Sequence, residues 1–340
     1  MSRIVLARLA TSAVALLLAA LFAFITLRVA PGDPARLVLG PFASDDAVQA
    51  LRQEMGLDQP LARQFLAYIT DFATGNWGFS YSVGQPVRDV LFERFPATIE
   101  LGLYAFLFAF LAALALALLG AWRQGPLTDG VPQALSVFAL GVPQFWFGLL
   151  ALMIGFEWLG LFPGPEGRLP HGMAPPPRVT GLVTVDALVA GDVHGFWRAL
   201  HQLILPAVSL GLLPFGFLLR LLRANLRDAG RETYVLVARS RGMRRAGVLW
   251  RFVLPNAIVP TLMASGLILG QLLAGSVLVE RLFNWPGAGA LVTQGVQQQD
   301  YSVVQAFILL SAVIYLLANL VIDLVVALID PRIGRGGRPA

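Results

Sequence analysis

The chain has 340 residues, of which 57% are hydrophobic and only 13% are charged, about half of the ~25% charged share of soluble proteins. This composition is typical of a polytopic membrane protein, and the absence of cysteine excludes disulfides and thiolate metal sites. All 25 basic residues are arginine. The chain therefore lacks the lysine that a P-loop places on nucleotide phosphates, and we attribute its net charge of +5 to membrane topology rather than to nucleic-acid binding.

Six charge-free stretches are long enough to cross a membrane, since a helix needs ~20 apolar residues to span a ~30 Å hydrocarbon core. They are residues 9–27, 101–122, 130–156, 199–219, 252–279 and 301–322. We interpret the first as a retained anchor helix, because it is longer than the apolar core of a usual signal peptide. The sequence therefore predicts an all-α polytopic membrane protein with six transmembrane helices.

The arginine distribution predicts that both ends of the chain face the cytoplasm (N-in, C-in). In this orientation the inner segments hold 15 arginines and four acids, whereas the outer segments hold 10 arginines and 15 acids, as the positive-inside rule requires. The predicted parts follow in chain order. They are an anchor helix at 1–30, a periplasmic segment at 31–98, a transmembrane core at 99–330 with a basic loop at 220–254, and a cytoplasmic tail at 331–340.

The outer segments contain signals for local structure. Ser44 is a candidate N-cap for a short helix that Gly56 ends, and a second helix is expected at 61–72, before the sequence "TGNWG". The region 160–198 begins with a Pro/Gly-rich stretch, so we expect an ordered loop there rather than a domain.

The basic loop carries nine arginines between Arg220 and Arg251. Charge alone fits a topology signal held near anionic headgroups, but the loop also has internal order. Tyr234, Val237, Ala238 and Arg241 share one helical face, and Gly242 then interrupts the helix. A short helix displayed between two spans is suited to binding by another protein.

This loop resembles a motif in the inner-membrane subunits of bacterial ABC importers, Glu-Ala-Ala followed by three residues, a glycine, nine residues and Ile-x-Leu-Pro. Ala238, Gly242 and Pro255 fit the spacing, whereas Leu236 and Phe252 replace the Glu and the Ile. The stretches "RVAPGDPARLVLG", "ERLFNWPGAGALV" and "NLVIDLVVALIDPRI" are similar to the dipeptide, oligopeptide and nickel branch. The resemblance covers nearly the whole chain.

The resemblance implies a transport subunit, not an enzyme, that forms half of a translocation pathway for peptides or similar small solutes in a bacterial inner membrane. The implied partners are a second homologous permease subunit, one or two ATPase subunits, a periplasmic or lipid-anchored solute-binding protein, and membrane lipids. It implies no cofactor on this chain, with ATP and Mg bound by the ATPase chains. Residues 238–246 would form the coupling helix on the ATPase. The predicted ATPase-coupling residues are Tyr234, Val237, Ala238, Arg239, Arg241, Gly242, Arg244 and Arg245; for the arginines, contact with lipid headgroups stays an open alternative.

Several further residues allow two interpretations. Trp285, Pro286 and Gly287 form either an outer gate or binding-protein contact, or only a re-entrant bend. Asn319 and Asp323 share one face of the last span, where a structural contact competes with a functional role. Glu157 and Glu280 follow apolar stretches, and we expect both to be solvated.

Two rival classes have less support from the sequence. An ion-coupled secondary transporter should show ionisable residues near the membrane midplane and repeated broken helices, whereas these apolar stretches are free of charge through their centres. An intramembrane enzyme would need catalytic side chains at membrane depth, and no such group is evident. Neither rival explains the basic loop with its glycine.

Overall fold

The computed structural model describes residues 2–29, 34–40, 42–122, 125–274 and 277–329, so the predicted tail at 331–340 lies outside them. Within the described residues four helices are long and apolar enough to cross a membrane, and a bent pair makes a fifth crossing if it is one span. The first predicted span contributes a described apolar part, Thr11–Ile25, that is shorter. The chain is thus mainly helical, with several helices of membrane-spanning character.

The N-terminal part consists of one long helix and three short ones. These are α1 (Ser2–Val29), α2 (Pro34–Leu39), α3 (Asp45–Glu54) and α4 (Leu61–Thr74). The Ser44 hydroxyl accepts a hydrogen bond from the Ala47 N–H, so the predicted N-cap of α3 is confirmed. Gly56 follows the C-cap of α3, and α4 ends at Thr74 with Gly75 as its C-cap, two residues beyond the predicted end at 72.

A two-stranded hairpin, β1 (Phe79–Ser80) with β2 (Gln85–Pro86), leads into the long helix α5 (Val87–Trp122). The Asp300 carboxylate holds this hairpin, because it accepts hydrogen bonds from the hydroxyls of Ser80 (2.7 Å) and Ser82 (2.8 Å). Residues 220 positions apart in the sequence are therefore joined beside the start of the last long helix.

The third predicted span is not a straight helix. It is divided into α6 (Pro126–Gly141) and a second part, α7 (Gln144–Ala151) continued by the π-helical turn η1 (Leu152–Trp158), with an angle of 108° between the two parts. The residue before a proline is disfavoured in the helical region, and Val142, which precedes Pro143, is extended. The charge-free stretch alone did not reveal this break.

The remaining described helices form the central packing and both ends of the molecule. They are α8 (Val183–Val189), α9 (Val193–Ala229), α10 (Thr233–Ser240), α11 (Arg245–Val248), η2 (Leu249–Val253), α12 (Leu254–Leu273), α13 (Val277–Leu282), α14 (Ala288–Gln297) and α15 (Tyr301–Ile329). The region expected to be only a loop, 160–198, thus contains α8 and the first turn of α9.

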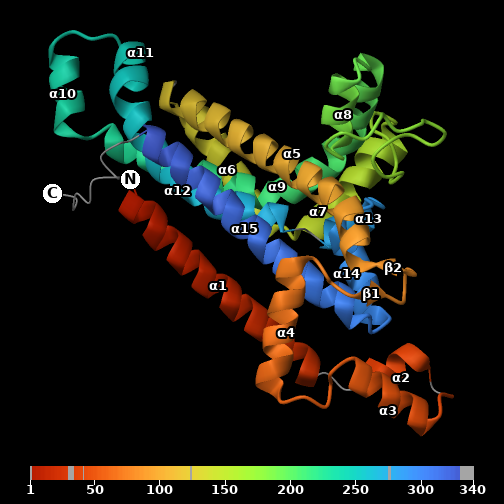
Figure 1. Ribbon diagram of the computed structural model, residues 1–340. Helices are drawn as coiled ribbons and strands as arrows, with labels where there is room; N and C mark the ends of the chain where they lie inside the picture. Colours follow the sequence, from red (N-terminus) through yellow and green to blue (C-terminus); the bar gives the residue numbers. More distant parts are fainter. Residues whose placement is uncertain (1, 30–33, 41, 123–124, 275–276, 330–340) are drawn as a thin grey trace.

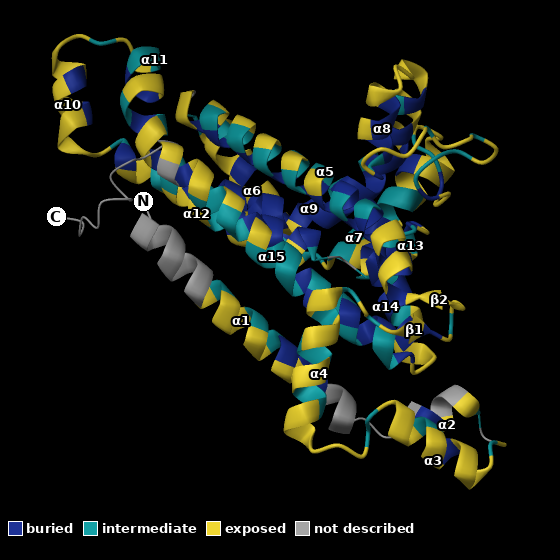
Figure 2. Ribbon diagram, in the orientation of Figure 1, coloured by how far each residue is buried: buried dark blue, intermediate teal, exposed yellow. Residues whose placement is uncertain are grey.

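Helix α9 lies at the centre of the structure and packs against α5, α6, α7, α8 and α12. Many of its residues are buried, and the helix is dark blue where it is visible in Figure 2. On α5 the facing positions are the small residues Ala105, Ala109, Ala113 and Ala117, all buried and spaced by four. Small residues at this period let two membrane helices approach closely.

The connections gather at two opposite ends (Figure 1). One end of the molecule contains the first turn of α1, the end of α5, the α10–α11 loop and the end of α15. The other end contains α2 to α4, the hairpin, α8, α13 and α14. We label these the inner end and the outer end, after the orientation that the arginine distribution predicts. Candidate functional residues occur at both.

Candidate functional site

The loop at the inner end presents a two-sided helix, α10. Val235 and Ala238 are buried in the same apolar cluster as Leu222 of α9 and Val248 of α11. Tyr234 and Val237, by contrast, are exposed, with 45% of Val237 accessible, and so is Leu236. One face of α10 is thus packed on the bundle, and the other exposes neighbouring apolar side chains. Such exposed apolar patches are a feature of protein-contact surfaces. The predicted coupling residues Tyr234 and Val237 therefore face outward, and Ala238 holds the helix in place.

The segment 238–246, expected to form the coupling helix, is not one helix, and its division falls at Gly242, where the sequence also predicts an interruption. Helix α10 ends at Ser240, Arg241 is its C-cap, and the chain becomes helical again only at Arg245, after the extended N-cap Arg244. Gly242 has φ = +77°, a left-handed conformation that glycine adopts without steric cost. No atom lies within 4 Å of the place where a Cβ would be added there, so the turn requires glycine for its backbone conformation and not for space.

The predicted arginines divide into two groups. Arg241 and Arg244 lie at the exposed tip of the loop beside Gly242. Arg239 and Arg245 line a cavity between the loop and the inner ends of α5, α6 and α9. The sequence placed these four side chains in one set, and the structure directs them to different surroundings.

At the outer end, α13 and the bend that follows it enclose a buried carboxylate. The Glu280 side chain is 0% exposed, which corrects the expectation that it is solvated. It accepts hydrogen bonds from the Thr98 hydroxyl (2.7 Å) and the Ala290 N–H (2.9 Å). Burial raises the pKa of Glu280, and hydrogen bonds from Thr98, Ala290 and Gly289 act in the opposite direction. A Cβ on Gly287 would lie 2.4 Å from the Glu280 carboxyl carbon, so this close approach requires glycine.

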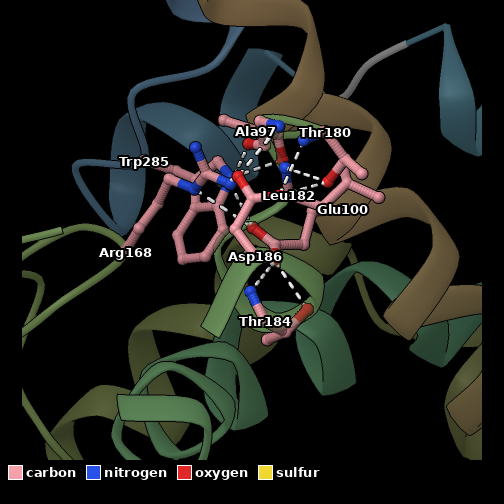
Figure 3. Close-up of polar contacts among 9 residues, drawn as sticks. Ala97, Glu100, Arg168, Thr180, Leu182, Thr184, Asp186 and Trp285 are labelled. Carbon is pink, nitrogen blue, oxygen red and sulfur yellow. Dashed lines mark hydrogen bonds and ion pairs between the residues drawn. The ribbon is translucent and has the colours of Figure 1, made fainter. Parts of the chain in front are cut away.

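Trp285 is buried at this bend, and its indole N–H donates to the Ala97 carbonyl of α5 (2.7 Å) (Figure 3). The predicted contact with a binding protein therefore does not extend to the ring of Trp285. Pro286 and Gly287 lie in the same bend, between α13 and α14. The segment 285–287 is fixed to the bundle by its own contacts.

A second buried carboxylate, Glu100 of α5, lies one helical turn from Ala97 (Figure 3). It accepts hydrogen bonds from the Arg168 guanidinium (2.5 and 3.1 Å) and from the Thr184 N–H and hydroxyl (2.8 and 2.7 Å). Arg168 also donates to the Gly181 carbonyl. Glu100 thus joins the loop after η1 and the start of α8 to the bundle, as a buried charge must be paired.

Asp186 organises the neighbouring turn. It accepts hydrogen bonds from the N–H and hydroxyl of Thr180 (both 2.7 Å) and from the Gly181 N–H (2.9 Å). Burial opposes ionisation, but these donors outweigh it and lower the pKa of Asp186. Sequence reasoning missed Glu100, Arg168 and Asp186, although Glu100 stands directly before an apolar stretch of span length, which is a signal for a paired or interfacial carboxylate.

The polar residues of the last span have structural contacts. The Asn319 amide donates to the Tyr315 carbonyl (2.9 Å) one turn earlier on α15. Asn319 also packs beside Gly270 of α12, whose added Cβ would lie 3.2 Å from the amide nitrogen. Asp323 is half-buried. The described residues contain no group of three or more His, Cys, Asp and Glu side chains placed to hold a metal ion.

Long apolar helices, a basic inner loop anchored from behind and a tightly packed outer bend define a polytopic transport subunit. The chain belongs to the family of inner-membrane components of binding-protein-dependent transport systems. The model of that family matches residues 113–335, and the model of its N-terminal part matches residues 1–102. It is therefore a multi-pass inner-membrane protein of a transport system, and the alternative of an ion-coupled secondary transporter is excluded.

The curated relatives are permease subunits. The probable D,D-dipeptide transport system permease protein of Escherichia coli (strain K12) is 41% identical over 315 residues, with 92% of each chain covered. The di/tripeptide transport system permease protein of Pseudomonas aeruginosa (strain UCBPP-PA14) is 37% identical over 314 residues, with 92% of this chain and 93% of the relative covered. A chain of a solved amino acid ABC transporter with histidines has a TM-score of 0.44 at 18% identity, over 69% of this chain and 90% of its own.

Proposed function

We propose that this chain forms one half of the translocation pathway of an ATP-driven importer of di- or oligopeptides or similar small solutes. The observation that carries the proposal is α10, a helix anchored by Val235 and Ala238 that exposes Tyr234, Leu236 and Val237 beside an open left-handed glycine. The peptide substrate is supported by the names of relatives that cover more than nine-tenths of this chain.

The outward face of α10 is the proposed contact with a cytoplasmic ATPase subunit. Because the chain contains no lysine, a P-loop and its Mg-bound ATP belong to separate chains. The turn at Gly242 holds α10 and α11 as two short arms, and α11 continues through η2 into α12. A displacement of α10 by the ATPase would therefore be passed directly to the bundle, through the cluster that contains Val235 and Val248. Such coupling requires that each partner bind one state better than the other.

The proposed topology has six crossings with both ends in the cytoplasm. Helix α1 and the bent pair α6–α7 count as one crossing each, together with α5, α9, α12 and α15. The supporting observation is the gathering of the basic loop, the start of α1 and the end of α15 at the inner end (Figure 1). A second homologous permease subunit would complete the pathway, and a solute-binding protein would dock at the outer end. Asn319 and Asp323 are proposed to have structural roles, and Pro286 and Gly287 to shape the outer gate.

The test replaces Val237 by aspartate, with Val189→Asp as the matched control. Both valines are exposed and lie on short helices, but Val189 belongs to α8 at the outer end. We expect Val237→Asp to abolish dipeptide uptake and recovery of ATPase subunits with the chain, because a charge cannot enter an apolar contact without a partner. Val189→Asp should retain the ATPase subunits. Normal uptake and ATPase recovery with Val237→Asp would disprove the coupling assignment.

A further inference from the structure

A cavity of about 750 Å³ lies at the inner end, behind the coupling loop. Its walls come from the last turns of α5, the start of α6, the end of α9, and the helices α10, α11 and η2. Its apolar lining includes Leu226, Val248 and Val253, and the small residues Ala117 and Gly120 leave room beside them. The cavity therefore has an apolar side toward the bundle and a polar rim.

The rim is strongly basic. Five arginines line the cavity against a single acid, and these are Arg223, Arg227, Arg231, Arg239, Arg245 and Asp129. Arg223 is the arginine that meets the acid, with 3.4 Å between its Nη2 and the Asp129 Oδ1. Arg227, Arg231, Arg239 and Arg245 form no ion pair with any described acidic residue. Four positive charges thus converge on one concave surface without a protein counterion in the described part of the chain.

Two simpler explanations cover only part of this arrangement. An arginine in the last turn of α9 favours the negative end of the helix dipole, which accounts for Arg227. The positive-inside rule accounts for basic residues in this loop, but it sets no direction for their side chains. Neither explains why Arg239 of α10 and Arg245 of α11 line the same cavity as Arg227 and Arg231.

We propose that this cavity binds a multivalent phosphate anion. Guanidinium groups bind phosphate oxygens in a bidentate manner, and a cavity with one sign of charge and low-dielectric walls concentrates counterions. A ligand there joins α9 to both arms of the coupling loop, so it fixes the loop against the bundle. The same chemistry is supplied by the headgroup of an anionic phospholipid, whose glycerol would meet the apolar side, and by a soluble diphosphate.

The experiment measures the phospholipid and the pyrophosphate that bind to the full chain, which is purified with the chains that remain attached to it. The protein is placed in nanodiscs of phosphatidylcholine with or without cardiolipin, recovered in mild detergent, and analysed for bound phospholipid by native mass spectrometry. Pyrophosphate binding is measured in parallel on the cardiolipin-free sample. The variant is Arg227→Gln with Arg231→Gln. The control is Arg241→Gln with Arg244→Gln, which removes the same charge from the tip of the same loop but outside the cavity lining.

We expect cardiolipin or pyrophosphate to bind about 25-fold more weakly to the cavity variant, because each of the two arginines removed contributes about fivefold to the affinity for phosphate. Binding to the control variant should be unchanged. Loss of cardiolipin identifies the lipid headgroup as the source, and loss of pyrophosphate alone identifies a soluble one. Ala121→Glu adds a carboxylate to the exposed edge of the cavity without removing an arginine and should have the same effect. Equal binding in the wild type, the cavity variants and the control, or no binding of either probe, would overturn the proposal.

Discussion

At the scale of single residues, the Glu280 carboxylate stabilises the outer bend by joining different helices. Its two oxygens accept from different elements, one from Thr98 on α5 and the other from Ala290 on α14. Thr98 in turn accepts from the Ala288 N–H (2.9 Å). The glycines at 287 and 289 allow this approach, because an added Cβ would lie within 3 Å of the carboxylate at either position.

The first prediction concerns Glu280→Gln, with Glu157→Gln as its control. An amide group cannot accept at both positions, so one donor loses its partner in the buried site, and unfolding should become easier by about 1–3 kcal/mol. Glu157 is exposed, and its substitution should change stability by less than ~0.5 kcal/mol. Chemical unfolding midpoints in mild detergent compare the two. Equal midpoints would show that Glu280 is not held as described.

The second prediction uses Asp186, whose pKa is lowered by its donors despite burial. A carboxylate with a lowered folded pKa stabilises the fold above its unfolded pKa of about 3.9 and loses this contribution as the pH falls through the folded value. Protease resistance of the segment 179–192 should therefore decrease below about pH 4. Asp186→Asn should be less resistant at neutral pH and largely insensitive to this acidification. An identical pH profile in both proteins would contradict the role of Asp186.

At the scale of elements, α5 and α9 pack closely because small residues occupy the positions at which the two helices meet. A Cβ on Gly211 of α9 would lie 2.5 Å from the Ala105 carbonyl oxygen of α5. Gly211→Ala should therefore separate the helices and destabilise the protein by roughly 1–3 kcal/mol. Gly130 lies in α6 with nothing within 4 Å of an added Cβ, so Gly130→Ala should stabilise by roughly 1 kcal/mol. The same change in unfolding midpoint for both variants would argue against this contact.

The fourth prediction concerns Gly242 in the coupling loop, and its control is Gly84, a glycine with almost the same φ. Gly242 (φ +77°) and Gly84 (φ +74°) both have open space at the Cβ position, and each N–H donates one backbone hydrogen bond. Proline at either position fixes φ near −65° and removes that bond. Gly242→Pro should abolish dipeptide uptake while the protein remains inserted, whereas Gly84→Pro in the hairpin should leave most uptake. Comparable uptake in the two variants would remove the coupling role of the turn.

At the scale of the whole molecule, the sequence predicted what depends on local chemistry and composition. The N-cap at Ser44 and the glycine turn at Gly242 are confirmed, because side-chain capping and positive φ are local properties. The break before Pro143 was missed because the length and hydrophobicity of a stretch do not show whether its helix is straight or bent. The environment of Glu280 was mispredicted because one of its donors, Thr98, lies 182 residues away on α5, and the other, Ala290, reaches it only through the fold of the bend before α14.

The helical geometry of α10 also explains why the predicted arginines divide into two groups. Arg239 and Arg241 are two residues apart on α10 and its cap, so their side chains point in different directions. One therefore lines the cavity and the other lies at the tip of the loop. The resemblance to the family grouped both as coupling residues, whereas we propose an anion contact for Arg239 and an ATPase contact for Arg241.

The central claim is that this chain works as one subunit of an ATP-driven importer. The most direct measurement is gentle extraction of the chain from its native membrane, followed by mass spectrometry of the proteins that remain bound. The account predicts a second homologous permease subunit together with P-loop ATPase chains, and loss of the ATPase chains with Val237→Asp. Recovery of the chain alone or as a simple homo-oligomer, with no ATPase in the wild-type sample, would contradict the account.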